Sequence, residues 1–234
     1  MRQILKCSTA LVLLIAGTCC AEGGAAPGVP DAPDSLLSVR PELSAGMGVE
    51  YLSAPDVVDY VNGLSGQFGA TTRIPDFKAG VGFFGALDYP LSADWILKAE
   101  YVYLLVSYNP NIPYGSTEFT LNIQMPTLII QRVLWDERLY NVKAGFGLGY
   151  HFASLTTKYA FVDDHLTGSG PGADLELEAN TAFGDHLYAY LGGDARFEFI
   201  GRLKNSSSTQ TTLLTLPTVS AFSIGARLGF SYYF

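Results

Sequence analysis

A histidine and a serine, His151 and Ser154, stand three positions apart, and Asp163, Asp164 and His165 follow in the next segment. A serine hydroxyl, an imidazole and a carboxylate are the groups from which proteins build acyl-transfer sites. The paired aspartates could instead bind a divalent cation. A simpler interpretation makes His151 a rim histidine bonded to loop backbone and the aspartates a solvated loop tip. The elements that position these residues decide between the interpretations.

The rest of the chain carries no motif for cofactor chemistry. It has no glycine-rich phosphate loop, no clustered His/Cys metal set and no nucleophile elbow, so we expect no cofactor. The formal net charge is −8. Because phosphate backbones require a basic surface, we expect nucleic acid not to be a partner.

The start of the chain predicts secretion. Arg2 and Lys6 precede an apolar run at 11–16 that is followed by small residues, which is typical of a signal peptide over residues 1–21. The run is too short to span a bilayer as a helix. Cleavage would remove two basic residues and no acidic one, so the charge would change from −8 to −10.

All three cysteines lie within the predicted signal peptide, so the mature chain is expected to contain none. An alternative is a lipoprotein anchored at Cys19 or Cys20, but the leucine expected three positions earlier is missing. Residues 22–40 are rich in Gly, Ala and Pro and show no apolar period. We expect them to form a flexible periplasmic leader.

The last 13 residues, 222–234, alternate strictly between two kinds of side chain, as a strand with one face in lipid and one in a lumen would. The predicted lipid face comprises Phe222, Ile224, Ala226, Leu228, Phe230, Tyr232 and Phe234. The predicted lumen face comprises Ser223, Gly225, Arg227, Gly229, Ser231 and Tyr233.

Seven earlier segments show the same period of two. Their apolar faces lie at 43–51, 77–83, 95–103, 119–125, 140–152, 173–179 and 187–199. Eight strands, an even number, close a single-chain bacterial barrel. The sequence therefore predicts an all-β fold, an eight-stranded antiparallel transmembrane up-and-down β-barrel over residues 41–234.

The fourth of these strands is expected to turn Phe119, Leu121, Ile123 and Met125 toward lipid. Its polar residues Glu118, Thr120, Asn122 and Gln124 would then face the lumen. Beyond Pro126 the alternation blurs, which predicts a β-bulge there.

Connection lengths support the same topology. Long irregular stretches are expected after the odd strands, around 53–75, 107–116, 154–171 and 203–215, and short turns after the even ones, at 88–94, 135–138 and 183–186. Short turns are periplasmic in such barrels, so four loops would lie at the cell surface, the longest including Val57 to Leu64. Tyr140 and Tyr150 are ten residues apart, a height of roughly 25 Å that fits two aromatic girdles.

Charged residues keep to the predicted lumen face. They are Lys78, Lys98, Glu100, Lys143, Glu176, Glu178, Asp194, Arg196, Glu198 and Arg227. An eight-stranded barrel is just wide enough for its own side chains, and unpaired charges there are costly, so we expect a salt-bridged plug. Inward glycines leave open a gated ion or proton path, although glycine also suits a tightly curved sheet.

A soluble barrel of the lipocalin kind is the structural alternative, with apolar residues inside and charges in water. In a membrane, placing the basic residues on the lipid face instead would cost up to about 2–4 kcal/mol each near the midplane. The charge pattern therefore fixes the two faces if the barrel is in a membrane.

The C-terminal strand resembles the β-signal by which bacterial barrels are recognised for assembly. Arg227, Gly229, Tyr232 and Phe234 occupy its polar, glycine and two aromatic positions. With the strand pattern, residues 41–234 are similar to the small eight-stranded outer-membrane barrels, the superfamily of the outer-membrane protein A transmembrane domain and the opacity proteins. The resemblance implies the outer membrane of a Gram-negative-type bacterium, and as partners its lipid and lipopolysaccharide, periplasmic chaperones and the barrel-assembly machinery.

Some barrels of this kind hydrolyse or transfer acyl chains of lipopolysaccharide. The deacylase pattern is His-x-Ser on the lipid face, whereas here the spacing is His-x-x-Ser and His151 is expected to face inward. We therefore expect no enzyme but a structural or surface-interaction role through the loops. The alternatives are a small-solute or ion channel and a lipid A-modifying acyl hydrolase or transferase.

Overall fold

The computed structural model describes residues 40–67, 69–70, 73–110, 117–137, 139–159, 162–205 and 216–234. The predicted signal peptide and cysteines, and the predicted leader up to residue 39, lie outside these residues. The elements are β1 (Glu42–Ser53), α1 (Pro55–Gln67), β2 (Phe77–Pro90), β3 (Trp95–Tyr108), β4 (Thr117–Glu137), β5 (Tyr140–Tyr159), β6 (Val162–Ala182), β7 (Leu187–Arg202), β8 (Lys204–Asn205) and β9 (Thr218–Tyr233).

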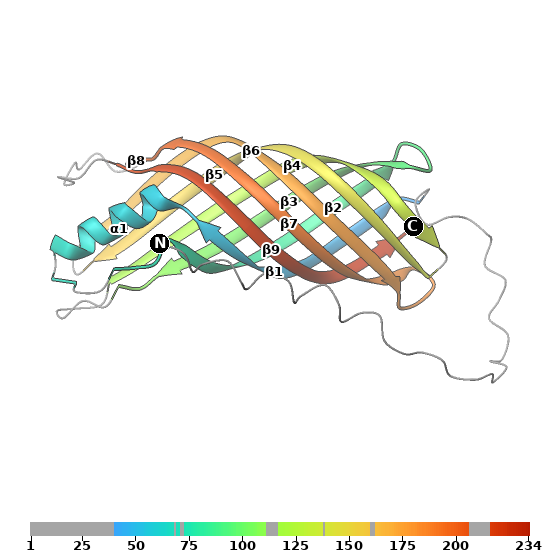
Figure 1. Ribbon diagram of the computed structural model, residues 1–234, viewed down its shortest axis with the longest axis horizontal. Coiled ribbons are helices and arrows are strands. Elements are labelled where there is room, and N and C mark those ends of the chain that lie inside the picture. The colour runs from blue at the N-terminus through green and yellow to red at the C-terminus, as the bar shows by residue number, and fades with distance from the viewer. Residues whose placement is uncertain are drawn as a thin grey trace, which may run out of the picture. The chain divides into compact units, whose positions relative to one another are not determined.

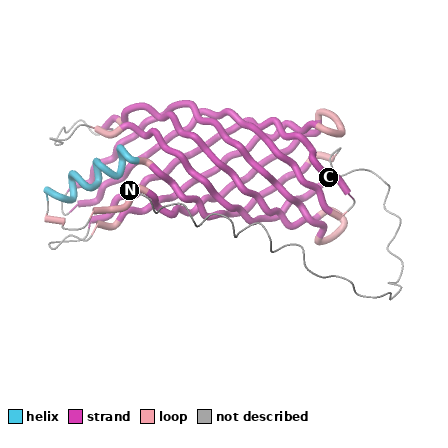
Figure 2. Tube along the Cα trace, viewed as in Figure 1, coloured by secondary structure: helices cyan, strands magenta, loops and turns pink. Residues whose placement is uncertain are grey.

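Eight long strands form one closed antiparallel barrel, as the sequence predicts (Figures 1 and 2). Each strand pairs with the next along the chain, β7 pairs with β9, and β9 pairs with β1 to close the ring. The two-residue β8 adds to the edge of β6. We call the end with the short connections from β2 to β3, from β4 to β5 and from β6 to β7 the turn end, and the opposite end, which carries α1, the loop end.

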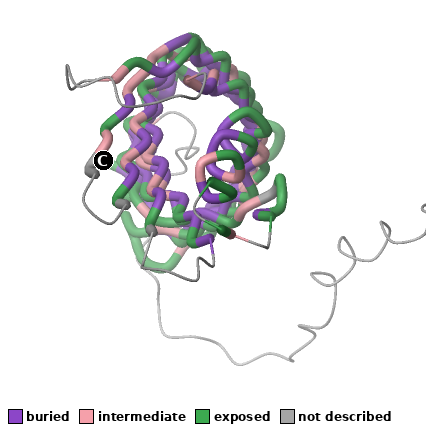
Figure 3. Tube along the Cα trace, turned by 90° about the vertical axis from the view of Figure 1, so that its left-hand side faces the viewer, coloured by how far each residue is buried: buried purple, intermediate pink, exposed green. Residues whose placement is uncertain are grey.

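Exposed and buried residues alternate along the strands, as the view down the barrel in Figure 3 shows. Large apolar side chains point outward over much of the barrel's height; we call this surface the apolar belt. Its members include Met47, Val49, Phe83, Leu97, Tyr101, Leu128, Ile130, Phe146, Leu148, Leu175, Leu191, Phe197, Ile224, Leu228 and Phe230. Such a surface is stable against lipid, where a closed barrel leaves no backbone group unpaired.

Two inward glycines allow the barrel to close. Gly46 of β1 and Gly229 of β9 are direct cross-strand partners at the closing seam. A Cβ on Gly46 would lie 2.1 Å from the carbonyl oxygen of Leu228, and one on Gly229 would lie 2.3 Å from that of Ala45. Neither position therefore has room for a side chain, and the close approach supports the interpretation of these glycines as a device for curvature.

At the loop end the pattern of faces differs from the prediction for β4. Phe119, Leu121, Ile123 and Met125 point inward and are 0–1% exposed, while Glu118 and Gln124 are exposed on the outer wall. The predicted assignment of this segment was wrong because it lies beyond the apolar belt. There the outer wall meets water, so apolar side chains fill the interior as in a soluble protein.

The bulge of β4 also lies elsewhere. The β4–β5 register is the same on both sides of Pro126, and the shift occurs between Val133 and Trp135. Two predicted turns begin later than expected, because Asp88 belongs to β2 and Trp135 to β4.

The stretch predicted as a loop at 154–171 is instead a hairpin, in which β5 and β6 stay paired as far as Tyr159 and Val162. We call the outer parts of three neighbouring strands, residues 117–124 of β4, 154–159 of β5 and 162–169 of β6, the extension. The expected loops at 107–116 and 203–215 lie largely outside the described residues.

The surface loop expected at 57–64 is the helix α1. Pro55 begins it and Asp56 stands in its first turn, both favourable at a helix N-terminus. Val57, Val58 and Val61 follow at helical spacing and are buried. No helix in the described part of the chain is long and apolar enough to cross a bilayer.

Candidate functional site

Two lysines from neighbouring regions of the barrel share one carboxylate in the lumen. Nζ of Lys98, on β3, lies 2.9 Å from Glu178 and 3.1 Å from Glu176 on β6. Nζ of Lys143, on β5, lies 2.9 Å from the other oxygen of Glu178 and 3.0 Å from Asp88 on β2. Glu178 therefore ties β3, β5 and β6 together across the interior.

Two arginines continue the network toward the loop end. Nη2 of Arg196 lies 3.0 Å from one oxygen of Glu100, and Nη1 of Arg227 lies 2.7 Å from the other. Arg196 also contacts Glu50 at 2.7 Å, and both arginines contact Asp194, at 3.2 and 2.9 Å. These pairs link β1, β3, β7 and β9, strands distant in sequence.

Four acids that the sequence analysis left out complete the network: Glu42, Glu50, Asp88 and Asp174. All four stand on inward positions of their strands, so the period of two was the signal that could have found them. With Glu100, Glu176, Glu178 and Asp194, they place eight carboxylates around the four basic side chains Lys98, Lys143, Arg196 and Arg227. We call these twelve residues the ion-pair layer.

Two predicted members lie outside this layer. Lys78 is half-buried near the loop end of β2 and makes none of the ion pairs found among the described residues. Glu198 pairs instead with Nδ1 of the buried His151, whose Nε2 lies 3.2 Å from the hydroxyl of Thr127. His151 is therefore a core histidine bonded to side chains, and not a rim residue bonded to loop backbone as the simpler interpretation had it.

Three acids of the layer, Glu42, Asp88 and Glu178, bring their oxygens within 4.8 Å of one another, as do Glu100, Asp174 and Glu176. In the first group the Lys143 ammonium contacts all three carboxylates. The second group is contacted by Lys98, Arg196 and Arg227. Basic side chains thus take the place that a metal ion would fill.

The ion-pair layer is buried within the barrel. The side chains of its basic residues are 0–1% exposed. The barrel interior here is packed by its own side chains, as expected for eight strands.

A second, apolar layer lies between the ion pairs and the loop end. We call it the apolar plug; it includes Leu52, Val102, Leu104, Val106, Tyr108, Phe119, Leu121, Ile123, Leu155, Leu166, Ile200, Leu203 and Val219, with Val57, Val58 and Val61 of α1. The helix thus packs on the inner residues of the strands. Burial, with the carboxylate of Asp164 as the smaller cause, raises the pKa of Tyr60 on α1 above its usual value.

The residues predicted for acyl transfer are divided between the two faces of the wall. His151 points inward, whereas Ser154 and His165 lie together on the outer wall of the extension. Ser154 Oγ is 3.4 Å from Nε2 of His165, and Thr156 Oγ1 is 3.2 Å from its Nδ1. Among the described side chains, two hydroxyls contact this imidazole. Asp164 is half-buried, and the side chain of Asp163 lies outside the description.

A groove of about 830 Å³ is lined by Ser154 and His165 on the outer wall, just beyond the apolar belt. We call it the basic groove; its lining includes Tyr103, Asn122, Gln124, Phe152, Ser154, His165, Thr167, Ser169, Arg202 and Lys204. Arg202 faces outward because a bulge between Ile200 and Arg202 shifts the end of β7.

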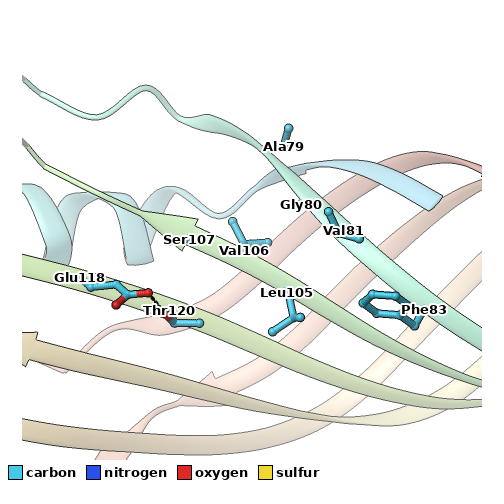
Figure 4. A pocket seen from close by; sticks show the side chains of 9 residues that line it. All are labelled: Ala79, Gly80, Val81, Phe83, Leu105, Val106, Ser107, Glu118 and Thr120. Atoms are coloured by element: carbon cyan, nitrogen blue, oxygen red, sulfur yellow. Dashed lines mark hydrogen bonds between the residues drawn. The ribbon is translucent and has the colours of Figure 1, made fainter. Parts of the chain in front are cut away.

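A second groove, of about 540 Å³, lies where β2 separates from β3 (Figure 4). The β2–β3 ladder reaches only to Val81 and Leu105, although β3 continues to Tyr108. Figure 4 shows Val106 beside Gly80, and a Cβ on Gly80 would lie 2.7 Å from a Val106 methyl. Val106 therefore fills the seam and keeps the plug closed behind it.

The four residues of the predicted assembly signal lie on β9 and at the residue after it. Arg227 belongs to the ion-pair layer, and Gly229 stands at the closing seam. Tyr232 and Phe234 are exposed on the outer wall at the turn end, with ring centroids 5.2 Å apart in an edge-on contact. Recognition of these residues by assembly machinery stays a prediction.

A closed barrel with an apolar belt outside and charges inside defines an integral β-barrel protein of the Gram-negative outer membrane. No protein-family model and no curated protein matches the chain. The fold is similar to that of neisserial surface protein A (NspA), with a TM-score of 0.51 and 13% identity over 83% of this chain and 97% of that one.

Two further solved barrels are similar at lower scores. One is Ail, the attachment invasion locus protein of Yersinia pestis, with a TM-score of 0.47 and 8% identity over 83% of this chain and 99% of that one. The other is the outer membrane protein OprG of Pseudomonas aeruginosa, with a TM-score of 0.48 and 11% identity over 86% of this chain and 99% of that one. At these identities the likeness concerns the fold alone.

Proposed function

We propose that the protein is a sealed outer-membrane scaffold that presents its extension and loops for interaction at the cell surface. In this arrangement the turn end faces the periplasm and the loop end faces outward, in line with the short connections between strands at the turn end.

The observation that carries the proposal is the double closure of the lumen. The side chains of the ion-pair layer are buried in the lumen, and the apolar plug with α1 fills the interior above it. From this filling we expect no steady transport through the barrel, whereas the extension holds a polar outer wall beyond the apolar belt on three paired strands. Binding sites are commonly held on rigid scaffolds in this manner.

The test is to shorten the extension without disturbing the barrel. Residues 157–164 of the β5–β6 hairpin are replaced by Asn-Gly, a two-residue turn that joins the cross-strand pair Thr156 and His165. Heat-dependent gel mobility checks that the variant remains a folded barrel. Cells displaying either protein are then compared for self-aggregation, for attachment to an epithelial monolayer and for binding of serum proteins.

We expect the folded, shortened variant to lose at least one of these interactions. The shortening removes Lys158, Asp163 and Asp164 and so changes the net charge by +1. Substitution of Asp163 by Asn in the full-length hairpin makes the same change of charge alone and is the control. Equal behaviour of shortened and full-length proteins in all three assays would contradict a surface role of the extension.

The second candidate function is lipid acyl chemistry, favoured by the 3.4 Å separation of Ser154 and His165 on the outer wall. Mass analysis of lipid A from cells expressing the protein or its Ser154→Ala variant tests it. A serine-dependent loss of an acyl chain would establish the enzyme, and identical lipid A would exclude lipid A as its substrate.

A further inference from the structure

The basic groove holds a concentration of positive charge on an acidic protein. Arg202 and Lys204 are both exposed, His165 also lines the groove, and none of the described lining residues carries a carboxylate. Within the described residues, neither Arg202 nor Lys204 takes part in an ion pair. The whole chain has a net charge of −8, so the basic lining of this groove contrasts with the charge of the protein as a whole.

The position of the groove relative to the apolar belt is equally specific. Phe152, which lines its lower edge, belongs to the outward apolar face and forms an edge-on contact with Tyr150 at 5.6 Å. The Tyr150 hydroxyl lies 3.1 Å from Oγ of Ser169, a residue of the groove. Tyrosine places its ring in the interfacial region with its hydroxyl toward water, so this contact marks the boundary of the hydrocarbon layer.

The polar lining supplies neutral hydrogen-bonding groups between the aromatic edge and the cations. Asn122 and Gln124 of β4 and Thr167 of β6 face outward in the same groove. Gln124 already accepts a 3.0 Å hydrogen bond from Tyr101 through its carbonyl oxygen, which leaves its amide nitrogen available as a donor. Amides and hydroxyls are suited to sugar hydroxyls, and Arg and Lys to phosphate.

From this order of groups we propose that the basic groove binds the phosphorylated sugar headgroup of an outer-leaflet glycolipid. Arg202 and Lys204 contact the phosphate, Asn122, Gln124 and Thr167 contact the sugar, and the acyl chains run down the apolar belt from Phe152. The occupant is a lipid headgroup because the groove opens at the lipid boundary and its lower wall is apolar. The inference rests on the proposed outward orientation of the loop end.

The experiment uses the folded full-length protein in phosphatidylcholine vesicles, with and without diphosphorylated lipid A, and with lipid A freed of phosphate. The temperature at which the folded gel band is lost reports binding, because a ligand of the folded state raises it. The variant is Arg202→Gln combined with Lys204→Gln. The matched control is Lys158→Gln, which removes an exposed lysine of the extension outside the groove lining.

We expect diphosphorylated lipid A to raise the temperature at which the folded gel band is lost, both for the wild type and for Lys158→Gln. The phosphate-free lipid should raise this temperature much less. The double variant should bind with about tenfold weaker affinity for each cation lost, since each removes a charge-assisted hydrogen bond. The proposal would be overturned if diphosphorylated lipid A raised the transition temperature of the double variant as much as that of the wild type. It would also be overturned if lipid A with and without phosphate raised the transition temperature of the wild type equally. Full stabilisation by millimolar inorganic phosphate without lipid A would overturn it as well, since it would indicate a free-anion site.

This result is separable from the surface role. If the double variant loses lipid binding but cells displaying it attach as before, the scaffold function stays intact. If the shortened variant loses attachment but still binds lipid A, the lipid site stays intact.

Discussion

The ammonium of Lys143 lies 2.9 Å from Glu178, its direct cross-strand partner on β6. The other oxygen of Glu178 lies 2.9 Å from Lys98, and the side-chain amide of Asn180 donates a 2.7 Å hydrogen bond to the first. One carboxylate thus contacts two buried cations, and we regard it as the central contact of the ion-pair layer.

Replacement of Glu178 by Gln should therefore destabilise the barrel strongly. The change removes the one carboxylate that contacts both Lys98 and Lys143, and each lysine keeps two other carboxylates. The expected loss of stability is therefore at most the about 3–5 kcal/mol that removal of one partner of a buried pair costs. Urea titration of the folded gel band in vesicles measures it. Asp174→Asn is the matched control, because among the described residues Asp174 forms an ion pair with Arg196 alone, at 3.3 Å, and that arginine keeps three other carboxylates. Equal effects of the two variants would show that Glu178 is not central.

The closing seam makes a second prediction. Gly229→Ala places a methyl group 2.3 Å from a β1 carbonyl oxygen, so β1 and β9 must separate and the yield of folded, heat-modifiable protein should fall severely. Gly193→Ala on β7 is the control, since its nearest atom outside its chain neighbours would be 3.8 Å away. Normal folding of Gly229→Ala would contradict the seam as described.

The reversed faces of β4 can be tested by chemical labelling of intact cells. Gln124→Cys should react with a membrane-impermeant maleimide, because residue 124 is exposed on the outer wall. Ile123→Cys should not react, because residue 123 is 0% exposed inside the apolar plug. The opposite pattern would restore the assignment that the sequence alone suggested.

Docking of α1 depends on its buried valines. Val61→Asp introduces a carboxylate where the side chain is 0% exposed, so the helix should detach while the strands stay closed. Limited proteolysis should then cut within 55–67, and the heat-dependent gel shift should persist. Asp59→Asn is the control, since the pair of Asp59 with Arg73 is exposed and worth little. Cleavage of both variants at the same rate would contradict the packing of α1.

The strands within the apolar belt were predictable because lipid forces a strict rule on them. Met47, Leu148 and Leu228 face outward as their alternation indicates. The same rule fails for Ile123, because a period of two identifies two faces but not which one meets the interior. That choice depends on the surrounding medium, and β4 passes from lipid into water along its length.

The partners within the lumen could not be read from the sequence. Arg196 and Glu100 stand 96 residues apart and meet only through the stagger of strands around the barrel. The helix α1 did leave a signal in the spacing of its valines after Pro55. The basic groove left none, since the outward placement of Arg202 depends on a bulge at the end of β7.

The most direct test of the sealed scaffold is ion conductance of the purified, folded protein in planar lipid bilayers. The double closure by the ion-pair layer and the apolar plug predicts a bilayer that contains folded protein but shows no steady conductance steps. Regular, reproducible steps from protein whose folding is verified by gel mobility would show a continuous water path through the lumen, and would contradict the account in favour of a channel.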